Sequence, residues 1–277
     1  MTSKHENLGG DLSGQLIAAA IAVHREFGPG VDEPDYERAL SLELTARGIE
    51  HDCQVALPLV YKDTKLDCGY RIDLIVARQL LVELKAVDKL HPVHEAQLIT
   101  YLRLSGIKLG LLINFSEMLL RDGIKRRANS QAPSPRHRTT VATDTVATDT
   151  AFDPLSHAVI DAALEVQHVL GSDLLRSAYE AALAYELRLR GMKVAQRLPV
   201  NLVYREQLIP SEKEIPMVVD GQLMIACVCA KVVEPIHLAR QRSLLKAAKV
   251  DTGLCFNFHA ESMAAEIKRI SRTYKPF

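Results

Sequence analysis

One short stretch of the sequence combines an apolar strand pattern with two side chains of opposite charge. Residues 80–87 read Leu-Leu-Val-Glu-Leu-Lys-Ala-Val, which places Glu83 and Lys85 two residues apart. Side chains alternate between the two faces of a strand, so both groups lie on the same face. Burying an ion costs several kcal/mol unless it is paired or coordinated. We therefore expect a charged partner or a metal ion at this position.

A second acid stands ten residues before Glu83, where Asp73 is embedded in the apolar segment Arg-Ile-Asp-Leu-Ile-Val at 71–76. Two carboxylates brought together by neighbouring strands suit Mg²⁺, which takes one or two carboxylates, keeps several waters and completes its shell with substrate phosphate oxygens. Two structural interpretations remain open. Glu83 and Lys85 could form a cross-strand ion pair on an exposed edge, and Asp73 could hydrogen-bond a turn.

The elements that must position these residues follow from the spacing of apolar residues and of Gly and Pro. Residues 12–27 have the pattern of one helical face, and a second helix is expected from Pro34 to Gly48. The pattern then predicts a hairpin of two strands at 54–61 and 66–76, a third strand at 80–87, a helix at 92–105 and a buried strand at 109–115. This order favours a mixed α/β sheet covered by helices.

The second half of the chain repeats the first at a constant offset of 143 positions, without a gap. Leu59-Val60-Tyr61 returns as Leu202-Val203-Tyr204, and Asn114-Phe115 returns as Asn257-Phe258. This period is far longer than the roughly 20 to 50 residues of stacked repeats, so it indicates a tandem duplication of a domain.

We expect one domain at 1–129, a flexible polar linker at 130–153 and a second domain at 154–277. A linker of about twenty residues spans roughly 25 Å, which is enough for the two lobes to pair as an intramolecular pseudo-dimer.

In their order along the chain these motifs resemble the PD-(D/E)XK nuclease superfamily, whose signature is an acid, a gap and then Glu-x-Lys on the next strand. Here the signature reads Ile72-Asp73 followed by Glu83-Leu84-Lys85. The segment Gly-Val-Asp-Glu-Pro-Asp-Tyr at 30–36 is similar to the name motif of the GxxExxY protein family, and 67–87 also looks like that family. The resemblance covers nearly all of 12–129. It implies two tandem nuclease-like domains, each a mixed central sheet flanked by helices.

The resemblance also implies a metal site and its ligands. Asp73 and Glu83 would hold Mg²⁺ or Mn²⁺, with the Leu84 carbonyl and Glu33 as further ligands. Glu33 directly precedes Pro34 and could instead only cap its helix.

Two further residues receive catalytic roles from the same resemblance. Lys85 would orient or help to deprotonate the attacking water and stabilise charge on the phosphate. Gln97 would orient the other groups, or it could be an ordinary solvated helix residue. The implied catalytic set is Glu33, Asp73, Glu83, Lys85 and Gln97.

The second repeat lacks this whole set. The corresponding positions hold Arg176, Pro216, Ala226, Val228 and Arg240. Pro, Ala and Val side chains cannot coordinate Mg²⁺, so we expect 154–277 to be a degenerate, catalytically inactive domain. The basic residues of its helix after Pro235 could touch phosphate or simply form a solvated face.

Composition narrows the class of protein. The 277 residues hold 34 Lys and Arg against 34 Asp and Glu, which removes the strongly basic signature of an obligate nucleic-acid binder. Apolar runs fall far short of the ~20 residues of a membrane helix, and the N-terminus shows no signal-peptide core. We therefore expect a cytoplasmic location. The five cysteines form no CxxC pair, so we expect reduced thiols and no zinc.

The resulting expectation is a Mg²⁺-dependent phosphodiester hydrolase with one active N-terminal lobe, acting on DNA in preference to RNA. The alternative is a non-catalytic pseudo-nuclease scaffold that binds nucleic acid or protein.

Overall fold

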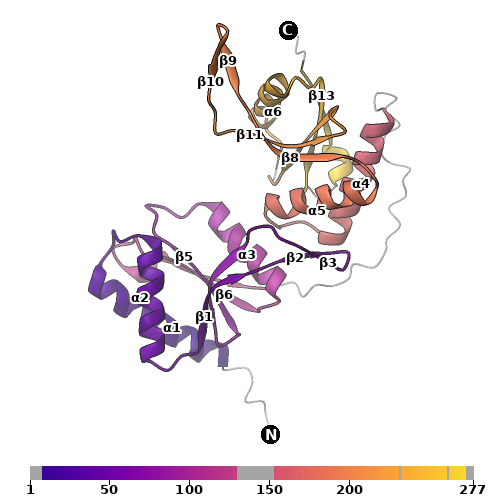
Figure 1. Ribbon diagram of the computed structural model, residues 1–277. Helices are drawn as coiled ribbons and strands as arrows, with labels where there is room; N and C mark the ends of the chain where they lie inside the picture. Colours follow the sequence, from indigo (N-terminus) through magenta and orange to yellow (C-terminus); the bar gives the residue numbers. More distant parts are fainter. Residues whose placement is uncertain (1–7, 130–152, 231, 261, 273–277) are drawn as a thin grey trace. The chain divides into compact units, whose positions relative to one another are not determined.

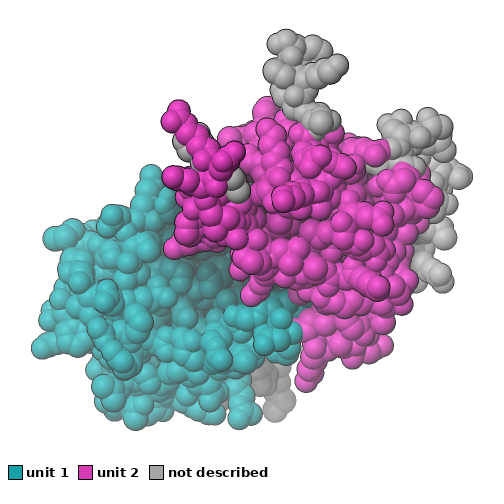
Figure 2. Space-filling view, turned by 45° about the horizontal axis from the view of Figure 1, so that its top comes forward, with its two compact units in different colours: residues 1–60, 67–134 teal, residues 61–66, 135–277 magenta. Residues whose placement is uncertain are grey.

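The computed structural model describes residues 8–129, 153–230, 232–260 and 262–272, which form two α/β repeats of the same design (Figure 1). By their contacts, residues 1–60 and 67–134 make one unit, and residues 61–66 join 135–277 in the other (Figure 2). Apart from Asp153, the predicted linker at 130–153 lies outside the described residues.

The first repeat begins with two helices, α1 (Leu8–Phe27) and α2 (Glu33–Ala46). Gly28 directly after α1 has a φ of 66°, a left-handed conformation that favours glycine and stops the helix. The remaining elements are β1 (His51–Ala56), β2 (Leu59–Tyr61), β3 (Thr64–Leu66), β4 (Arg71–Val76), β5 (Leu80–Lys85), α3 (Pro92–Ser105), β6 (Leu109–Asn114), the 3₁₀ turn η1 (Leu120–Gly123) and β7 (Ile124–Ala128).

Five of these strands form one sheet in the order β1-β4-β5-β6-β7. Strands β5 and β6 are parallel and are connected by α3, whereas the other neighbours are antiparallel. Leu74, Val82 and Leu84 belong to the apolar core that also includes residues of α1 and α2. Because side chains alternate along a strand, Asp73 and Glu83 lie on the opposite face of the sheet, which α3 contacts.

The predicted hairpin differs from the observed one. Each predicted strand is divided in two, at Leu57-Pro58 and at 67–70. Proline has no N–H for a strand ladder, and Asp67 Oδ1 accepts a hydrogen bond from the Gly69 N–H in a turn, 2.8 Å away. The outer halves therefore pair as the separate two-stranded β2–β3 arm, while β1 and β4 join the main sheet.

Strand β7 was not predicted, because its sequence Ile-Lys-Arg-Arg-Ala has little of the apolar pattern of a strand. In the structure it pairs with β6 and forms one edge of the sheet. Lys125 and Arg127 of this strand both form ion pairs with Glu95 of α3. A charged edge strand of this kind is common because it resists pairing with other chains.

The second repeat has the same order of elements. They are α4 (Pro154–Leu170), α5 (Arg176–Leu189), β8 (Val194–Pro199), β9 (Leu202–Tyr204), β10 (Gln207–Ile209), β11 (Glu214–Val219), β12 (Leu223–Val228), α6 (Pro235–Ala248), β13 (Thr252–Asn257), α7 (Met263–Glu266) and β14 (Lys268–Ser271). Its main sheet runs β8-β11-β12-β13-β14, with β12 and β13 parallel, and β9 and β10 form a second arm. The prediction of two mixed α/β domains is confirmed.

Residues that recur at the 143-residue offset form the same packing device in both repeats. The Tyr36 ring stacks on Phe115 with centroids 4.3 Å apart, and its hydroxyl donates to the Gly28 carbonyl. Tyr179 stacks on Phe258 at 4.4 Å in the second repeat. These recurring residues hold the loop between the first two helices against the end of the sheet.

Within the described ranges, no helix combines the length and the apolar composition needed to span a bilayer.

Candidate active site

Asp73 and Glu83 lie opposite each other at the point where β4 and β5 separate. The ladder between these strands ends with the pair Leu74 and Val82, directly before the two acids. Asp73 Oδ2 accepts a hydrogen bond from the Leu84 N–H at 2.8 Å. The carboxylate thus replaces a strand partner for Leu84 and is held in one orientation beside Glu83.

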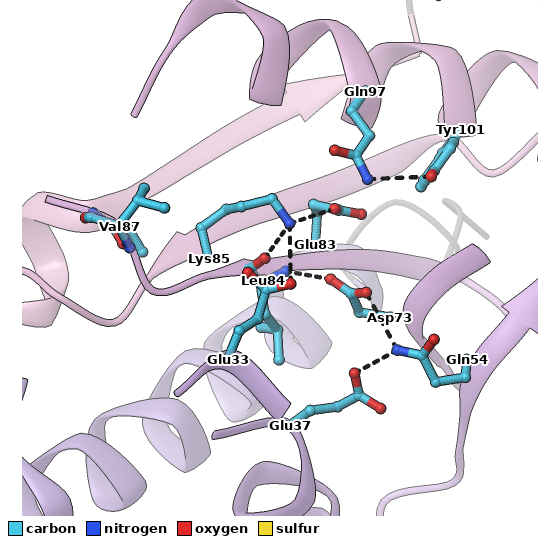
Figure 3. Close-up of polar contacts among 11 residues, drawn as sticks. Glu33, Glu37, Gln54, Asp73, Glu83, Leu84, Lys85, Val87, Gln97 and Tyr101 are labelled. Atoms are coloured by element: carbon cyan, nitrogen blue, oxygen red, sulfur yellow. Dashed lines mark hydrogen bonds and ion pairs between the residues drawn. The ribbon is translucent and has the colours of Figure 1, made fainter. Parts of the chain in front are cut away.

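The Lys85 ammonium lies among three oxygen atoms at the end of β5 (Figure 3). Its Nζ is 2.7 Å from Glu83 Oε1, 2.5 Å from the Leu84 carbonyl oxygen and 3.4 Å from Glu33 Oε1. Strand β5 is central in the sheet, and the Lys85 side chain is only 11% exposed. The interpretation of Glu83 and Lys85 as an ion pair on an exposed edge is therefore wrong, because the pair is buried in a central strand.

The two carboxylate oxygens of Glu83 differ in their contacts. Glu83 is fully buried, and Oε2 makes no hydrogen bond among the residues that the structure describes. A buried acceptor without a donor costs about 1–3 kcal/mol. This cost is more readily explained by a function at this position than by a contribution of Glu83 to folding stability.

Helix α2 supplies two carboxylates to the same group of residues. Glu33 is the first residue of the helix and contacts Lys85, while Asp32 is the N-cap residue, so Glu33 does not act as the helix cap. Glu37, one turn later, accepts a hydrogen bond from Gln54 Nε2 at 2.6 Å. Gln54 Nε2 also lies 3.4 Å from Asp73 Oδ1 and so links α2 to β4.

The sequence analysis missed Glu37 and Gln54. Glu37 could have been found from its position one helical turn after Glu33, on the same face. Gln54 lies in β1, opposite Asp73 of β4, and has a φ of 53°. No feature of the sequence predicts this left-handed conformation.

Gln97 lies beside this group, and its described hydrogen bond is to a residue of its own helix. Its Nε2 donates to the Tyr101 hydroxyl at 3.1 Å, on the face of α3 that looks toward Glu83 (Figure 3). Burial raises the pKa of Tyr101, and the nearby Glu83 and Asp73 charges add to this shift. Tyr101 is thus a neighbour of the acids that the sequence analysis did not single out.

The charges in this region do not balance. Burial raises the pKa of Asp73 to about 6 and that of Glu83 to about 8, and the Asp73 charge adds to the Glu83 shift while Lys85 opposes it. Although burial opposes its charge, Lys85 also has a raised pKa because of the Glu83 carboxylate. Three acidic side chains, those of Glu33, Asp73 and Glu83, therefore act on the Lys85 ammonium, and Glu37 adds a further acid near Asp73. An additional cation would be favoured here.

The ligand types fit a hard divalent cation such as Mg²⁺, which prefers carboxylate and carbonyl oxygens. In the described part of the chain, however, no three His, Cys, Asp or Glu side chains stand together as a metal-binding group. The Lys85 ammonium lies among the oxygens of Glu33, Glu83 and Leu84. A divalent ion would have to displace this ammonium to reach the same oxygens.

The second repeat keeps the framework and changes the side chains. Ala226 and Val228 are buried in β12, at the positions of Glu83 and Lys85. Arg176 begins α5 and lies 3.3 Å from Glu180, which occupies the position of Glu37. Arg197 has a φ of 52°, as Gln54 has in the first repeat. The two repeats therefore share the backbone arrangement of the site and the glutamate at the position of Glu37, but not Asp73, Glu83 or Lys85.

Comparison with known proteins adds one finding. No curated protein and no solved structure matches the chain. The family model described as the PD-(D/E)XK nuclease superfamily matches residues 10–127 and again residues 153–270. These two matches cover most of the chain and coincide with the two repeats, which confirms the tandem duplication. By this double match, supported by the acid, Glu-x-Lys and sheet arrangement above, the chain belongs to the PD-(D/E)XK nuclease superfamily.

Proposed function

We propose that this protein is a Mg²⁺- or Mn²⁺-dependent phosphodiester hydrolase that cleaves nucleic acid at the Asp73, Glu83 and Lys85 group of its first repeat. The observation that carries the proposal is the convergence of two buried carboxylates and an ammonium where β4 and β5 separate. Superfamily membership supports the reaction class. The motif at 30–36 supports the finer placement in the GxxExxY family.

Asp73, Glu83, the Leu84 carbonyl and Glu33 are the groups that would hold the ion. When bound, it would supply Lewis acidity and lower the pKa of a bound water. The Leu84 N–H fixes the orientation of Asp73. Lys85 is held as an ammonium by its carboxylate neighbours, so its proposed role is to orient the water and to stabilise negative charge on the phosphate, and not to accept a proton.

The second repeat is proposed to be catalytically inactive, since Pro216, Ala226 and Val228 offer no metal ligands. The preference for DNA over RNA is part of the proposal and rests on analogy within the superfamily. We also propose that the two lobes pair as an intramolecular pseudo-dimer and that the protein is cytoplasmic.

The proposal is tested with labelled single- and double-stranded DNA and RNA, incubated with the purified chain and Mg²⁺, Mn²⁺ or EDTA. We expect metal-dependent cleavage, and a loss of about 100-fold or more in Glu83→Ala and Lys85→Ala. Glu95→Gln is the matched control, because Glu95 forms ion pairs on α3 away from the acids. Equal cleavage by all four proteins would identify a contaminating nuclease and reject the assignment.

A second candidate function is favoured by one observation. The Lys85 ammonium satisfies Glu83 Oε1 without any metal ion, so the group could act as a structural ion pair in a pseudo-nuclease that only binds nucleic acid or protein. Metal-independent binding of an oligonucleotide, unchanged in Asp73→Asn and without cleavage, is the expected result for this candidate.

A further inference from the structure

The arm formed by β2 and β3 carries a set of polar contacts at its tip. Residues 61–66 belong by their contacts to the unit that contains α5. The Tyr61 hydroxyl donates to Glu186 Oε2 at 3.0 Å, and Lys62 Nζ lies 2.8 Å from the same oxygen. Thr64 Oγ1 and the Tyr185 hydroxyl are 2.8 Å apart. We call Tyr185 and Glu186 of α5, together with the C-cap residue Arg190, the seat of this arm.

The contact is buried and electrostatically matched. The Glu186 side chain is only 4% exposed, and its other oxygen accepts a hydrogen bond from Arg190 at 3.0 Å. Although burial opposes its charge, the hydrogen bonds from Lys62 and Arg190 hold the pKa of Glu186 below its ordinary value. Tyr61 is fully buried. The seat therefore contains a charged, buried carboxylate that is stabilised by the Lys62 cation of the arm.

The first repeat contains a second seat of the same design. At the 143-residue offset, Leu42 and Glu43 of α2 and its C-cap residue Arg47 stand at the positions of Tyr185, Glu186 and Arg190. Arg47 Nε donates to Glu43 Oε1 at 2.7 Å, as Arg190 does to Glu186. Here, however, Leu42 is 72% exposed and Glu43 keeps 32% of its side chain exposed.

The second repeat contains a second arm, formed by β9 and β10. Its turn places Arg205 at the position of Lys62. Three apolar side chains of this arm, Leu202, Leu208 and Ile209, are exposed, and Leu208 is 64% exposed. The structure thus contains one arm packed on its seat, and one further arm and one further seat that both present apolar surface to solvent.

We infer that the chain forms a reciprocal dimer in which the β9–β10 arm of each copy packs on the α2 seat of the other. The arm and the seat are both present in every copy, so two copies related by a two-fold axis make both contacts at once. Charge supports this choice of partner, because Arg205 would meet Glu43 as Lys62 meets Glu186. The exposed Leu42 and Leu208 would be covered in the same contact.

This inference does not depend on the proposed hydrolase activity. Glu43 follows Glu33 by ten residues of one helix, which corresponds to about 15 Å along the helix axis. The seat is therefore separate from the proposed metal ligand on the same helix.

Light scattering coupled to size-exclusion chromatography tests the dimer across a range of protein concentrations. We expect the mass of two chains for the wild type. Arg205→Glu and Glu43→Arg should each raise the dissociation constant at least tenfold, because each change places like charges at both contacts of the dimer. The double variant Arg205→Glu with Glu43→Arg exchanges the two charges and should restore the dimer, which excludes misfolding as the cause of the loss.

Arg78→Glu is the matched control, since Arg78 is an exposed arginine in the turn between β4 and β5, and it should remain a dimer. A wild-type mass of one chain at every concentration, as expected if the arm packs within its own chain, would overturn the inference. A dimer whose dissociation constant is unchanged in both single variants would overturn it as well.

Discussion

At the scale of single residues, Glu83 has the most demanding position in the protein. It is fully buried, one oxygen is paired with Lys85, and the other has no hydrogen bond among the described residues. A folded chain gains nothing from such an arrangement that an apolar residue could not supply, and the second repeat indeed has buried Ala226 there. The buried carboxylate of Glu83 is therefore better explained by a role in the function of the protein than by a role in its stability.

This position predicts an unusual dependence of stability on pH. The pKa of Glu83 rises from 4.5 to about 8 on folding, so between these values the folded state binds more protons than the unfolded state. The free energy of unfolding of the metal-free protein should therefore fall as the pH rises through this window. Glu83→Gln cannot ionise, and we expect it to flatten the fall.

Urea unfolding in EDTA at several pH values between about 5 and 8 measures this effect. Wild type and Glu83→Gln should have their largest difference at the alkaline end, where the variant is the more stable protein. Parallel stability curves for the two proteins would show that Glu83 titrates normally.

Residue types and spacing were sufficient to predict that Asp73, Glu83 and Lys85 lie close together. They stand on adjacent strands, and the alternation of side chains places them on one face. Glu33, which the resemblance implied as a metal ligand, also lies near this group and pairs with Lys85. The sequence could not predict the Gln54 contact, since it depends on a left-handed residue directly opposite Asp73. Gln97 instead donates to Tyr101, which lies four residues later on the same face of α3.

At the scale of elements, the buried side-chain amide of Asn114 ties the end of β6 to the chain that follows β5, next to the site. Asn114 at the end of β6 donates from Nδ2 to the Val87 carbonyl at 2.8 Å and accepts from the Val87 N–H at 3.1 Å. These bonds fix the chain directly after Lys85. Asn257 makes the equivalent pair of bonds with Ala230 in the second repeat.

The two asparagines offer a matched pair of variants. Asn114→Ala should lower the free energy of unfolding of its repeat by about 2–4 kcal/mol, because it leaves buried backbone groups unpaired. It should also lower the cleavage rate, since Lys85 loses its support. Asn257→Ala should destabilise its own repeat by a similar amount and leave cleavage unchanged. Equal losses of activity in both variants would contradict the placement of the site in the first repeat.

Helices and the central strands could be predicted from the sequence because their apolar periodicity is strong. The interruption of the predicted hairpin could not, because the apolar pattern of 54–61 continues through Leu57-Pro58 into the arm. The arm was thus read as part of the main sheet, whereas its tip belongs with the other unit.

At the scale of the whole molecule, the two repeats share a framework and differ in their charged residues. Both repeats keep the sheet order and the tyrosine and asparagine contacts, and only the first has acids at the positions of Glu33, Asp73 and Glu83. The tip of the first arm nevertheless contributes to the second unit through Lys62, which pairs with Glu186 and Glu165.

Lys62→Ala should therefore destabilise α5 of the second repeat, although Lys62 itself belongs to the first repeat. We expect faster hydrogen exchange in α5, equivalent to about 1–2 kcal/mol, because Glu186 stays buried with fewer donors. Lys65→Ala is the control, since Lys65 is an exposed residue of the same arm. Unchanged exchange in α5 for Lys62→Ala would show that the arm contact adds no stability.

The account rests on a cation site at Asp73 and Glu83, and calorimetric titration with Mn²⁺ tests it most directly. We predict saturable binding by the wild type, loss of binding in Asp73→Asn, and binding at least as tight in Lys85→Gln, because that variant removes the ammonium that competes for the same oxygens. Titrations that show no binding by the wild type, or equal binding by wild type and Asp73→Asn, would contradict the account.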